Sequence, residues 1–450
     1  PRRCTRAGER EGRSLSGQTR RARAALPGNA RLLIAARAAR SIGQGALVAD
    51  FALYLRALGW SAAAIGAVLT GSLAVSAALA LMVGPLSDRV GRRGFLLVYE
   101  SVLMLAATTA LFTSQPYLLT IAALLGGFGR GANGAAGPFS PVEQSWLAQG
   151  LAPAERGRAF SINVASGFLG MGLGAGLAAV PSFLGHWLPG PLAYRPLFAI
   201  VLAGSLVCVI FIFKAKDAPV ERSPAAPAPE DREAVAAAAA AEVVDAALTK
   251  QENRLLTRLV LANAVNGIGI GLTGPLMAYW FALRFGIGPA EIGPLMGVSF
   301  VLGALSALST GRLTRRFGLV RSVVGMRLVG LASLVALPLA PTLPLAAGLY
   351  MLRSVFNRGT AGARQALSIS LVRPRRRGTA ASINTVSLQI PRAISPIFSG
   401  LLYDAGLLAL PFLIAAGFQC AYLFLYYRGF RNHDPGLPGP RRDGEELEQG

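Results

Sequence analysis

Long stretches without a charged residue alternate along this chain with short polar connections. Such stretches cover residues 57–87, 101–129, 259–283, 292–311, 328–352 and 405–427. A helix crosses the hydrocarbon core of a bilayer with about 20 apolar residues, so each stretch is long enough for one crossing. A soluble core does not supply so many of these runs in series. The pattern therefore predicts a membrane protein.

Hydrophobic and polar positions together predict twelve transmembrane helices. We expect these spans at residues 31–57, 61–84, 94–113, 117–149, 157–184, 194–214, 254–284, 289–311, 318–340, 343–371, 378–403 and 407–428. Between the two sets of six, four prolines and an alanine-rich charged stretch indicate a linker with a short surface helix. The predicted organisation is a basic tail (1–30), a six-helix bundle (31–214), the linker (215–253), a second six-helix bundle (254–429) and a tail (430–450).

Arginine is distributed unequally between the connections. Those after spans 2, 4, 8 and 10 contain Arg89, Arg92, Arg93, Arg156, Arg158, Arg312, Arg315, Arg316, Arg321, Arg373, Arg375, Arg376 and Arg377, whereas those after the odd-numbered spans contain only Arg56, Arg195 and Arg284. Basic residues in short loops favour the cytoplasmic side. The bias predicts a multi-pass protein of the cell (inner) membrane with both termini and the linker in the cytoplasm, which requires an even number of spans.

The two halves repeat each other. The pattern R-G-x-A-x-S-I-N occurs at residues 156–163 and again at 377–384, and Pro116, Arg130 and Gly131 recur 228 positions later as Pro344, Arg358 and Gly359. Six-helix halves related by an axis along the membrane normal place a substrate site between them, near the midplane. The predicted fold class is an all-α membrane protein of two pseudo-symmetric six-helix bundles, with Arg130 and Arg358 on the two sides of one central site.

Charge and cysteine content exclude several other classes of protein. The net charge of +22 suggests a nucleic-acid binder, but the basic residues lie in alternate connections rather than on one face. The three cysteines have no disulfide or metal spacing. Two G-x-G-x-x-G patterns, at 129–134 and 269–274, lie in apolar spans and follow no strand, so they indicate close helix packing rather than dinucleotide binding. We expect no cofactor, no metal, no nucleic-acid partner and no enzymatic activity.

The connection between spans 2 and 3 carries a motif. Residues 84–93 read G-P-L-S-D-R-V-G-R-R, which resembles the signature loop of the major facilitator superfamily, G-x-L-x-D-R-x-G-R-R. The resemblance implies that fold and a cytoplasmic gate formed by Gly84, Asp88, Arg89, Gly91, Arg92 and Arg93. The counterpart in the second half, residues 311–320, departs from the pattern because Arg315 replaces the acid and Leu319 and Val320 replace the arginine pair.

Polar side chains at membrane depth are candidates for the transport site, because a charge near the bilayer centre costs about 2.5–3.5 kcal/mol on insertion scales. The candidates for the transport cavity and coupling are Asp50, Gln44, Arg130, Asn133, Asn263, Asn266, Arg353, Asn357, Arg358 and Arg392. The alternative for each is internal pairing that holds helices together. Glu100 and Glu143 lie nearer the cytoplasmic face, and we interpret them as gate or packing residues.

Asp50 and Arg130 are the pair that we expect to couple transport to protons. A carboxyl group that alternates between burial and a nearby cation can take up and release a proton. The position of Arg130 resembles that of the span-4 arginine of proton-coupled drug antiporters. The Gly-Pro step of those antiporters is absent from span 5, where Pro181 follows Val180.

The leading prediction is a secondary active transporter that moves a small molecule by alternating access, coupled to protons and slightly favoured as an efflux protein. The excess of intramembrane arginines supports an alternative, an organic-anion transporter or exchanger. A third hypothesis, from another class, is a membrane sensor that no longer transports. The expected partners are a small-molecule substrate, protons and the lipid bilayer, and we expect a monomer.

Overall fold

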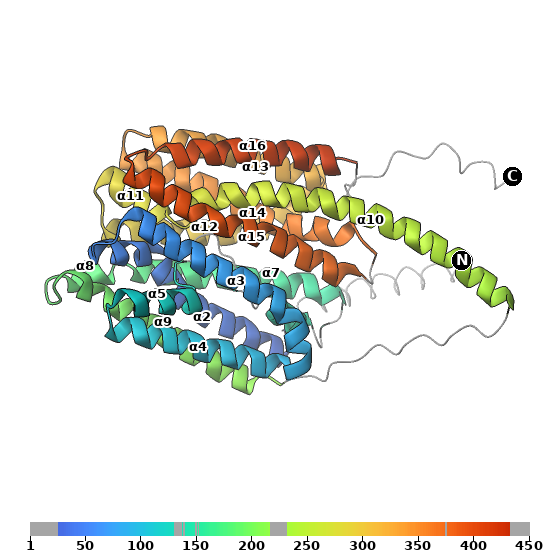
Figure 1. Cartoon of the computed structure of the whole chain (residues 1–450), viewed down its shortest axis with the longest axis horizontal. Helices are drawn as coiled ribbons and strands as arrows, with labels where there is room; N and C mark the ends of the chain where they lie inside the picture. Colours follow the sequence, from blue (N-terminus) through green and yellow to red (C-terminus); the bar gives the residue numbers. More distant parts are fainter. Residues whose placement is uncertain are drawn as a thin grey trace, which may run out of the picture.

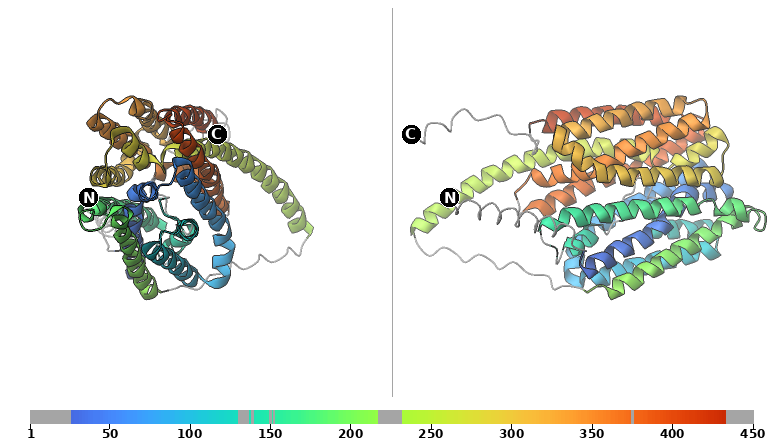
Figure 2. Two further views of the ribbon diagram at one scale, coloured as in Figure 1. Left: turned by 60° about the vertical axis from the view of Figure 1, so that its left-hand side comes forward. Right: turned by 180° about the vertical axis from the view of Figure 1, so that it is seen from behind.

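The computed structural model describes residues 26–129, 137, 140–148, 151, 153–216, 232–373 and 376–432. This part of the chain is helical and contains no strand. The helices run roughly side by side in two groups, one from each half of the chain (Figure 1), and Figure 2 shows the same groups from two further sides. We call the end at which α10 projects the linker end and the opposite end the far end.

The first group contains the six predicted spans of the first half. Its helices are α2 (Gly28–Ala57), α3 (Ala62–Val90), α4 (Arg92–Phe112), α5 (Pro116–Gly126), α6 (Ser140–Ala148), α7 (Pro153–Leu177), α8 (Val180–Leu184), the short 3-10 helix η2 (Gly190–Tyr194) and α9 (Arg195–Lys214). Span 4 divides into α5 and α6. Gly127, with φ of +65°, ends α5, because a left-handed residue cannot continue a helix.

The second group contains the other six spans. Its helices are α10 (Arg232–Thr273), α11 (Met277–Phe285), α12 (Pro289–Phe317), α13 (Leu319–Ala336), the 3-10 helix η3 (Leu337–Leu339), α14 (Leu343–Ser370), α15 (Arg377–Asp404) and α16 (Leu410–Phe430). Span 7 divides at residues 274–276. The repeat is visible at the far end, where Gly59 and Gly286 follow equivalent spans with φ of +85° and +68°.

The expectation of a separate surface helix in the linker is wrong in one respect. This segment is continuous with span 7, and α10 runs for 42 residues, about 63 Å at 1.5 Å per residue. That length is roughly twice the thickness of the hydrocarbon core. No glycine or proline occurs from residue 232 to 266, and alanine has the highest helix propensity, so nothing stops the helix before the membrane.

The loop after α14 holds α10 at the linker end. The guanidinium of Arg373 donates to Thr249 and Glu252, each at 2.9 Å, and forms an ion pair with Asp245. Arg376 also pairs with Glu252, at 2.8 Å. The hydrogen bonds to Glu252 and Asp245 raise the pKa of Arg373 above its ordinary value. The three α10 side chains that Arg373 contacts follow at four- and three-residue intervals, so they share one face of the helix.

Two pairs of helices join the bundles along their length. In these pairs α3 packs on α15 and α7 packs on α12. Glycines allow the first pair to approach closely: a Cβ atom at Gly400 would lie 2.2 Å from the Ala62 carbonyl oxygen, and one at Gly66 would lie 2.5 Å from the Pro396 carbonyl oxygen. The bundles therefore meet through backbone contact along this seam.

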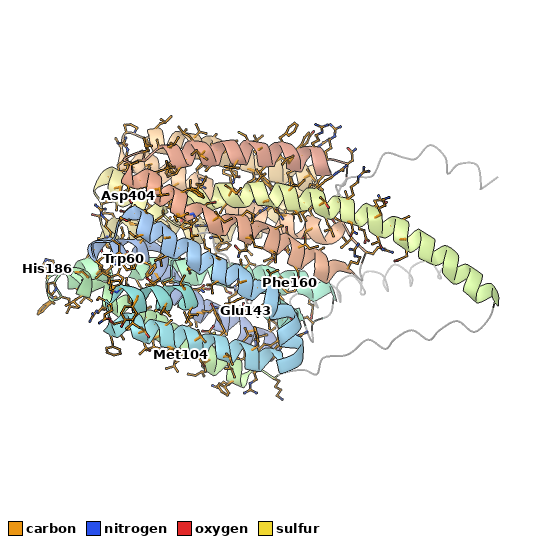
Figure 3. The ribbon with its side chains drawn as sticks, in the orientation of Figure 1. Trp60, Met104, Glu143, Phe160, His186 and Asp404 are labelled. Carbon is orange, nitrogen blue, oxygen red and sulfur yellow. The ribbon has the colours of Figure 1, made fainter. Side chains whose placement is uncertain are left out.

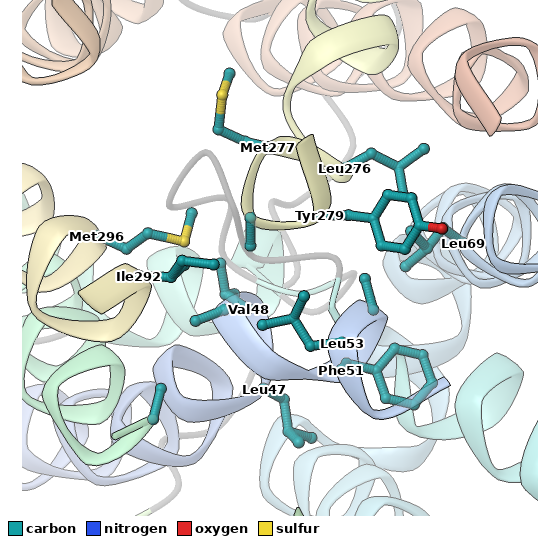
Figure 4. Packing of buried hydrophobic residues seen from close by; sticks show 14 of the residues in the cluster. Leu47, Val48, Phe51, Leu53, Leu69, Leu276, Met277, Tyr279, Ile292 and Met296 are labelled. Carbon is teal, nitrogen blue, oxygen red and sulfur yellow. The ribbon is translucent and has the colours of Figure 1, made fainter. Parts of the chain in front are cut away.

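The far end is closed by a shared hydrophobic core. One cluster contains residues of both halves, among them Leu53 of α2, Leu69 of α3, Met277 and Tyr279 of α11 and Ile292 of α12 (Figure 4). At the linker end the described residues form two separate clusters, one confined to each half. This asymmetry indicates that the structure holds the bundles together at the far end.

Candidate functional site

Eight helical segments among the described residues are long and apolar enough to cross a membrane. Spans 1, 10 and 11 are not among them, and span 4 is described only at residues 117–129, 137 and 140–148. These four spans carry all the candidates for the transport cavity except Asn263 and Asn266. A span that is polar on one side is stable in lipid only when that side faces protein or a water-filled space. Spans 1, 10 and 11, which carry most of these candidates, are therefore the described helices least able to face lipid all round.

Arg353 of α14 lies about 15 Å along the helix from its far-end residue Leu343. It is 8% exposed, and its guanidinium donates to the Thr273 hydroxyl at 2.9 Å. Thr273 is the last residue of α10, beside the interruption of span 7. The Nε atom of Arg353 is buried and has no hydrogen-bond partner in the part of the chain that the structure describes. A cation with an unused donor beside a broken helix at mid-depth is suited to an anionic ligand.

Arg358 faces the boundary between the two halves. Its guanidinium donates to the Ser299 carbonyl oxygen at 2.7 Å and the Ser299 hydroxyl at 3.2 Å. It lies over the Phe300 ring, 4.1 Å from the centroid, and 5.8 Å from the centroid of Phe168 in the other half. Phe168 belongs to α7, so this contact crosses the boundary between the halves. Arg130, the repeat partner of Arg358, lies outside the described residues, as does Asn133, so the symmetric arrangement stays a prediction.

Other candidates in the second bundle make contacts within that bundle. The Asn263 amide donates to the Asn384 carboxamide oxygen at 2.9 Å and to the Ser387 hydroxyl at 3.0 Å. The Asn266 carboxamide oxygen accepts from Gln419 at 3.1 Å. These contacts fit the alternative of internal pairing that holds helices together.

The remaining two candidates of the second bundle lie on α14 and α15. Asn357 is half-buried, and its carbonyl oxygen accepts from the Thr360 hydroxyl at 2.8 Å. Arg392 is 2% exposed and donates to Gln389 at 3.3 Å. Arg392 thus adds another cation at membrane depth.

Asp50 is fully buried on α2, in the half of the helix toward the far end. Neither of its carboxylate oxygens has a hydrogen-bond partner among the described residues. The proposed pairing with Arg130 falls outside the described residues, and Gln44, six residues earlier, is half-buried on the same helix. An unpartnered buried carboxylate is costly unless it binds a proton or a cation.

Sequence reasoning singled out Glu100 and Glu143 but missed Arg37 and Arg40, with which they form a buried group of charges in the first bundle. Arg40 of α2 pairs with Glu100 of α4 at 3.1 Å and with Glu143 of α6, and Arg37 pairs with Glu143 at 3.5 Å. Figure 3 places Glu143 toward the linker end. Two arginines three residues apart within an apolar span were the available signal. The four charges balance one another.

The second bundle has no such balance. Between residues 254 and 429 the only acids are Glu291, at the start of α12, and Asp404, at the end of α15. A further arginine missed from the sequence, Arg327 of α13, is 3% exposed and contacts Thr360, Asn266 and Gln419. Its partners are neutral. Membrane-depth arginines of this bundle therefore have no acid of their own half at the same depth.

The predicted gate loop is described only in part. Helix α3 continues to Val90, and the side chains of Gly84, Asp88 and Arg89 lie outside the described residues. Gly91 has φ of +88°, which a glycine adopts without strain. Next to it, Arg92 donates to the Ser145 carbonyl oxygen at 3.4 Å and Arg93 to the Phe213 carbonyl oxygen at 2.7 Å. The two arginines thus bind the loop to α6 and α9 of its own half.

A carboxylate joins the halves at the far end. The two oxygens of Asp404 accept hydrogen bonds from the backbone N–H groups of Ala62 and Ala63, each at 2.8 Å. These N–H groups belong to the first turn of α3, which has no intrahelical acceptor for them. Asp404, at the left of Figure 3, therefore caps a helix of the other bundle.

Comparison with known proteins places this architecture among transporters. The sequence profile of the Major Facilitator Superfamily matches residues 30–255 and 259–448. An uncharacterised membrane protein of Saccharomyces cerevisiae is 22% identical over 382 residues, 81% of this chain and 85% of that protein. A gallate transporter of Pseudomonas putida is 32% identical over 149 residues, which cover 33% of this chain and 30% of that protein.

Solved structures with the same fold are transporters as well. A variant of the nucleoside transporter NupG has a TM-score of 0.67 at 15% identity and covers 90% of this chain and 100% of its own. A bacterial homologue of the human lysosomal transporter Spinster, in an inward-facing conformation, has a TM-score of 0.66 at 17% identity, with coverages of 89% and 96%. A D-xylose–proton symporter has a TM-score of 0.65 at 15% identity, with coverages of 88% and 96%.

Proposed function

The chain belongs to the Major Facilitator Superfamily, and from this premise we propose that it carries a small organic anion across the membrane together with a proton. Membership makes it a multi-pass transmembrane transporter rather than an enzyme. The anion, the proton and their coupling by alternating access are the proposal. A proton and a monovalent anion that move together transfer no net charge, so the membrane potential does not oppose their movement.

The observation that carries the proposal is the uncompensated charge of the second bundle. Arg353, Arg358 and Arg392 are buried at membrane depth, and no acid of their own bundle lies at that depth. An arginine at the centre of a transmembrane helix costs about 2.5–3.5 kcal/mol on insertion scales, and the hydrogen bonds described above for these three arginines go to neutral groups. A carboxylate or phosphate group bound among them would offset part of this cost, and arginine recognises both groups through paired N–H donors. A cationic substrate would meet repulsion in the same place.

Aromatic rings beside these arginines favour a substrate with an apolar body. Phe300 lies against Arg358. The Tyr350 hydroxyl lies 3.5 Å from the Ser299 hydroxyl that Arg358 contacts. The Tyr350 ring packs edge-on with Phe281. The gallate transporter of Pseudomonas putida supports the same class of substrate, since gallate is an aromatic carboxylate. We therefore propose an aromatic carboxylate as the first compound to test.

Asp50 is the proposed proton site. It is buried and has no partner among the described residues, and a proton on this carboxyl group would remove the cost of an isolated buried charge. Its place on α2, in the first bundle, would let one half hold the proton while the other half holds the anion. Movement of the anion together with a proton implies uptake under an inward proton gradient, whereas the efflux that is slightly favoured from the sequence would need exchange against protons and stays a prediction.

The test is transport by the purified full-length chain in proteoliposomes. Gallate, benzoate and an aliphatic carboxylate are compared with an amphipathic cation, each with and without an imposed pH gradient. The proposal expects saturable flux of a carboxylate that a pH gradient accelerates. Flux of the cation alone would overturn the anion proposal, and absence of all flux would favour the non-transporting sensor.

Replacement of Arg353 tests whether the buried arginines of the second bundle bind the substrate. A hydrogen bond to a charged group contributes about 1.5–3 kcal/mol, so Arg353→Gln should weaken carboxylate transport roughly tenfold to a hundredfold in kcat/KM. Arg428→Gln is the matched control, because Arg428 is an exposed arginine at the linker end of α16. Unchanged carboxylate kinetics in Arg353→Gln would remove Arg353 from the substrate site.

A further inference from the structure

A pocket of about 470 Å³ opens on the second bundle, away from the candidate transport site. It lies between α12, α13 and α14 toward the linker end. Arg316, Phe317 and Arg321 line one part of it, and Gly325, Val329 and Phe356 line another. Its volume falls within the roughly 300–1,000 Å³ that is typical of small-molecule sites.

The pocket is charged at one end and apolar along its depth. Arg316 and Arg321 are exposed, flank the turn between α12 and α13, and have no ion-pair partner among the described residues. Arg316 lies over the Phe317 ring, 5.3 Å from its centroid. Val329 follows Arg321 by eight residues, about 12 Å along α13. The lining thus changes from guanidinium groups to apolar side chains over about 12 Å. This length suits a lipid headgroup followed by the start of an acyl chain.

The pocket is separate from the arginines proposed for transport. Phe356 and Arg358 are two positions apart on α14, so their side chains point about 200° apart around the helix. Phe356 faces the pocket, whereas Arg358 faces Ser299 and Phe168. Exposed Gly325 and Val329 place the pocket on the lipid-facing wall of the bundle.

We propose that this pocket binds an anionic phospholipid, with the phosphate between Arg316 and Arg321 and an acyl chain along Gly325, Val329 and Phe356. Basic pockets between transmembrane helices recognise the headgroups of acidic lipids. The loop from 311 to 321 contains Arg312, Arg315, Arg316 and Arg321 and no acid. This site gives a role to the loop whose sequence departs from the signature pattern of the first half.

The binding test uses the purified full-length protein in detergent. Native mass spectrometry and thermal stability are measured with dioleoyl phosphatidylglycerol, with dioleoyl phosphatidylcholine and with inorganic phosphate. The proposal expects selective retention of phosphatidylglycerol and a higher melting temperature with that lipid only. Equal protection by phosphatidylcholine would overturn the headgroup assignment, and equal protection by inorganic phosphate would show a free-anion site in place of a lipid site.

Two variants test the two parts of the pocket. An arginine near an acidic headgroup contributes about a factor of five in affinity, so Arg316→Gln with Arg321→Gln should weaken phosphatidylglycerol binding roughly 30-fold. Gly325→Leu should fill the apolar part, because a Cβ atom there meets nothing within 4 Å. Leucine also favours helix more than glycine does, so this variant should fold.

The matched controls make the same kinds of substitution at positions outside the pocket. Arg428→Gln removes an exposed arginine that lies 5.9 Å from the Phe424 ring centroid, and Gly417→Leu fills open space beside α16. Both should bind phosphatidylglycerol as the parent does. Parental binding by the double arginine variant or by Gly325→Leu would overturn the proposal. None of these outcomes depends on whether the substrate is an anion.

Discussion

Buried charges are neutralised in the first bundle but not in the second. In the first bundle Arg37 and Arg40 meet Glu100 and Glu143, so four buried charges cancel within one helix group. In the second bundle the buried arginines contact hydroxyl, amide and carbonyl groups, which satisfy donors but leave the charge. A group of charges that cancel one another stabilises the folded structure. Buried arginines without a neutralising acid are stabilised when a ligand of opposite charge binds.

Asp50→Asn should separate proton coupling from substrate movement. Asparagine keeps the shape of the side chain but takes up no proton, so accumulation driven by a pH gradient should fall to the level without a gradient. Substrate exchange between equal pools on both sides needs no net proton transfer and should persist. The measurement is gradient-driven uptake against counterflow in proteoliposomes.

Glu291→Gln is the control for Asp50→Asn, because Glu291 is an exposed acid at the start of α12. This variant should keep both activities. Undiminished gradient-driven uptake by Asp50→Asn would assign the proton to another group.

Arg40→Met should destabilise the protein by about 3–5 kcal/mol, because it leaves Glu100 buried without its cation. Adding Glu100→Met should recover most of this loss, since Arg37 and Glu143 remain paired. Denaturation in detergent, followed for the two single variants and the double variant, gives the coupling energy. Additive effects of the two substitutions would mean that the pair contributes nothing to stability.

Residues at membrane depth could be found from the sequence, but their orientation could not. The apolar runs locate Asp50, Arg353 and Arg358 because a charge is conspicuous there. Arg37 and Arg40 escaped attention near the end of span 1, where a long arginine can reach the interface. Asn263 and Asn266 were correctly placed in an apolar span, yet which side of the helix they occupy depends on packing that one sequence does not encode locally.

Some helix ends could be predicted from the local sequence, and others could not. Twelve crossings follow from hydrophobic runs, and glycines such as Gly59 and Gly286 mark their ends with positive φ. The break in span 4 was visible in principle, because Gly126, Gly127 and Gly129 lie close together there. The 42-residue α10 was missed because a change in polarity was taken as a helix boundary, although no residue in it breaks a helix.

Asp404 connects the ends of two helices from different bundles, and its removal should loosen the far end. A carboxylate at a helix N-terminus satisfies orphan N–H groups and the helix dipole. Loss of such a cap costs about 0.5–2 kcal/mol, so Asp404→Ala should lower the population closed at the far end roughly two- to thirtyfold relative to the open one.

Distances between spin labels measure this effect of Asp404→Ala. Labels at Phe112→Cys and Leu339→Cys report on the two halves, because both positions are exposed at the far end. The variant should populate longer distances, while Glu291→Gln should match the parent. An unchanged distribution in Asp404→Ala would mean that the apolar cluster of α2, α3, α11 and α12 closes this end without help.

The whole molecule combines a repeated architecture with an unequal distribution of charge and contact. The two bundles share a core at the far end, and their described residues form separate cores at the linker end. Arg373 and Arg376 fix the part of α10 that precedes span 7 to the loop after α14. Under the proposed alternating access, this part should move with the second bundle, and the far-end core must separate while a new contact forms at the linker end.

The distribution of arginine predicts which end of the molecule faces the cytoplasm. Thirteen arginines lie in the four connections at the linker end, and three lie in those at the far end. In cells that express a variant with Cys4, Cys208 and Cys420 replaced by serine, a cysteine in place of Ser223 should react with an impermeant maleimide only after permeabilisation. A cysteine in place of Trp187, which is 84% exposed in the far-end connection before η2, should react in intact cells. The opposite result at both positions would mean that the protein has the inverse orientation in the membrane. Reaction at both positions in intact cells would mean that the two ends do not lie on opposite sides. The positive-inside preference acts on short loops near the ends of spans. Replacing Arg312, Arg315 and Arg316 by glutamine should leave the orientation unchanged, because ten arginines remain in the linker-end connections against three at the far end.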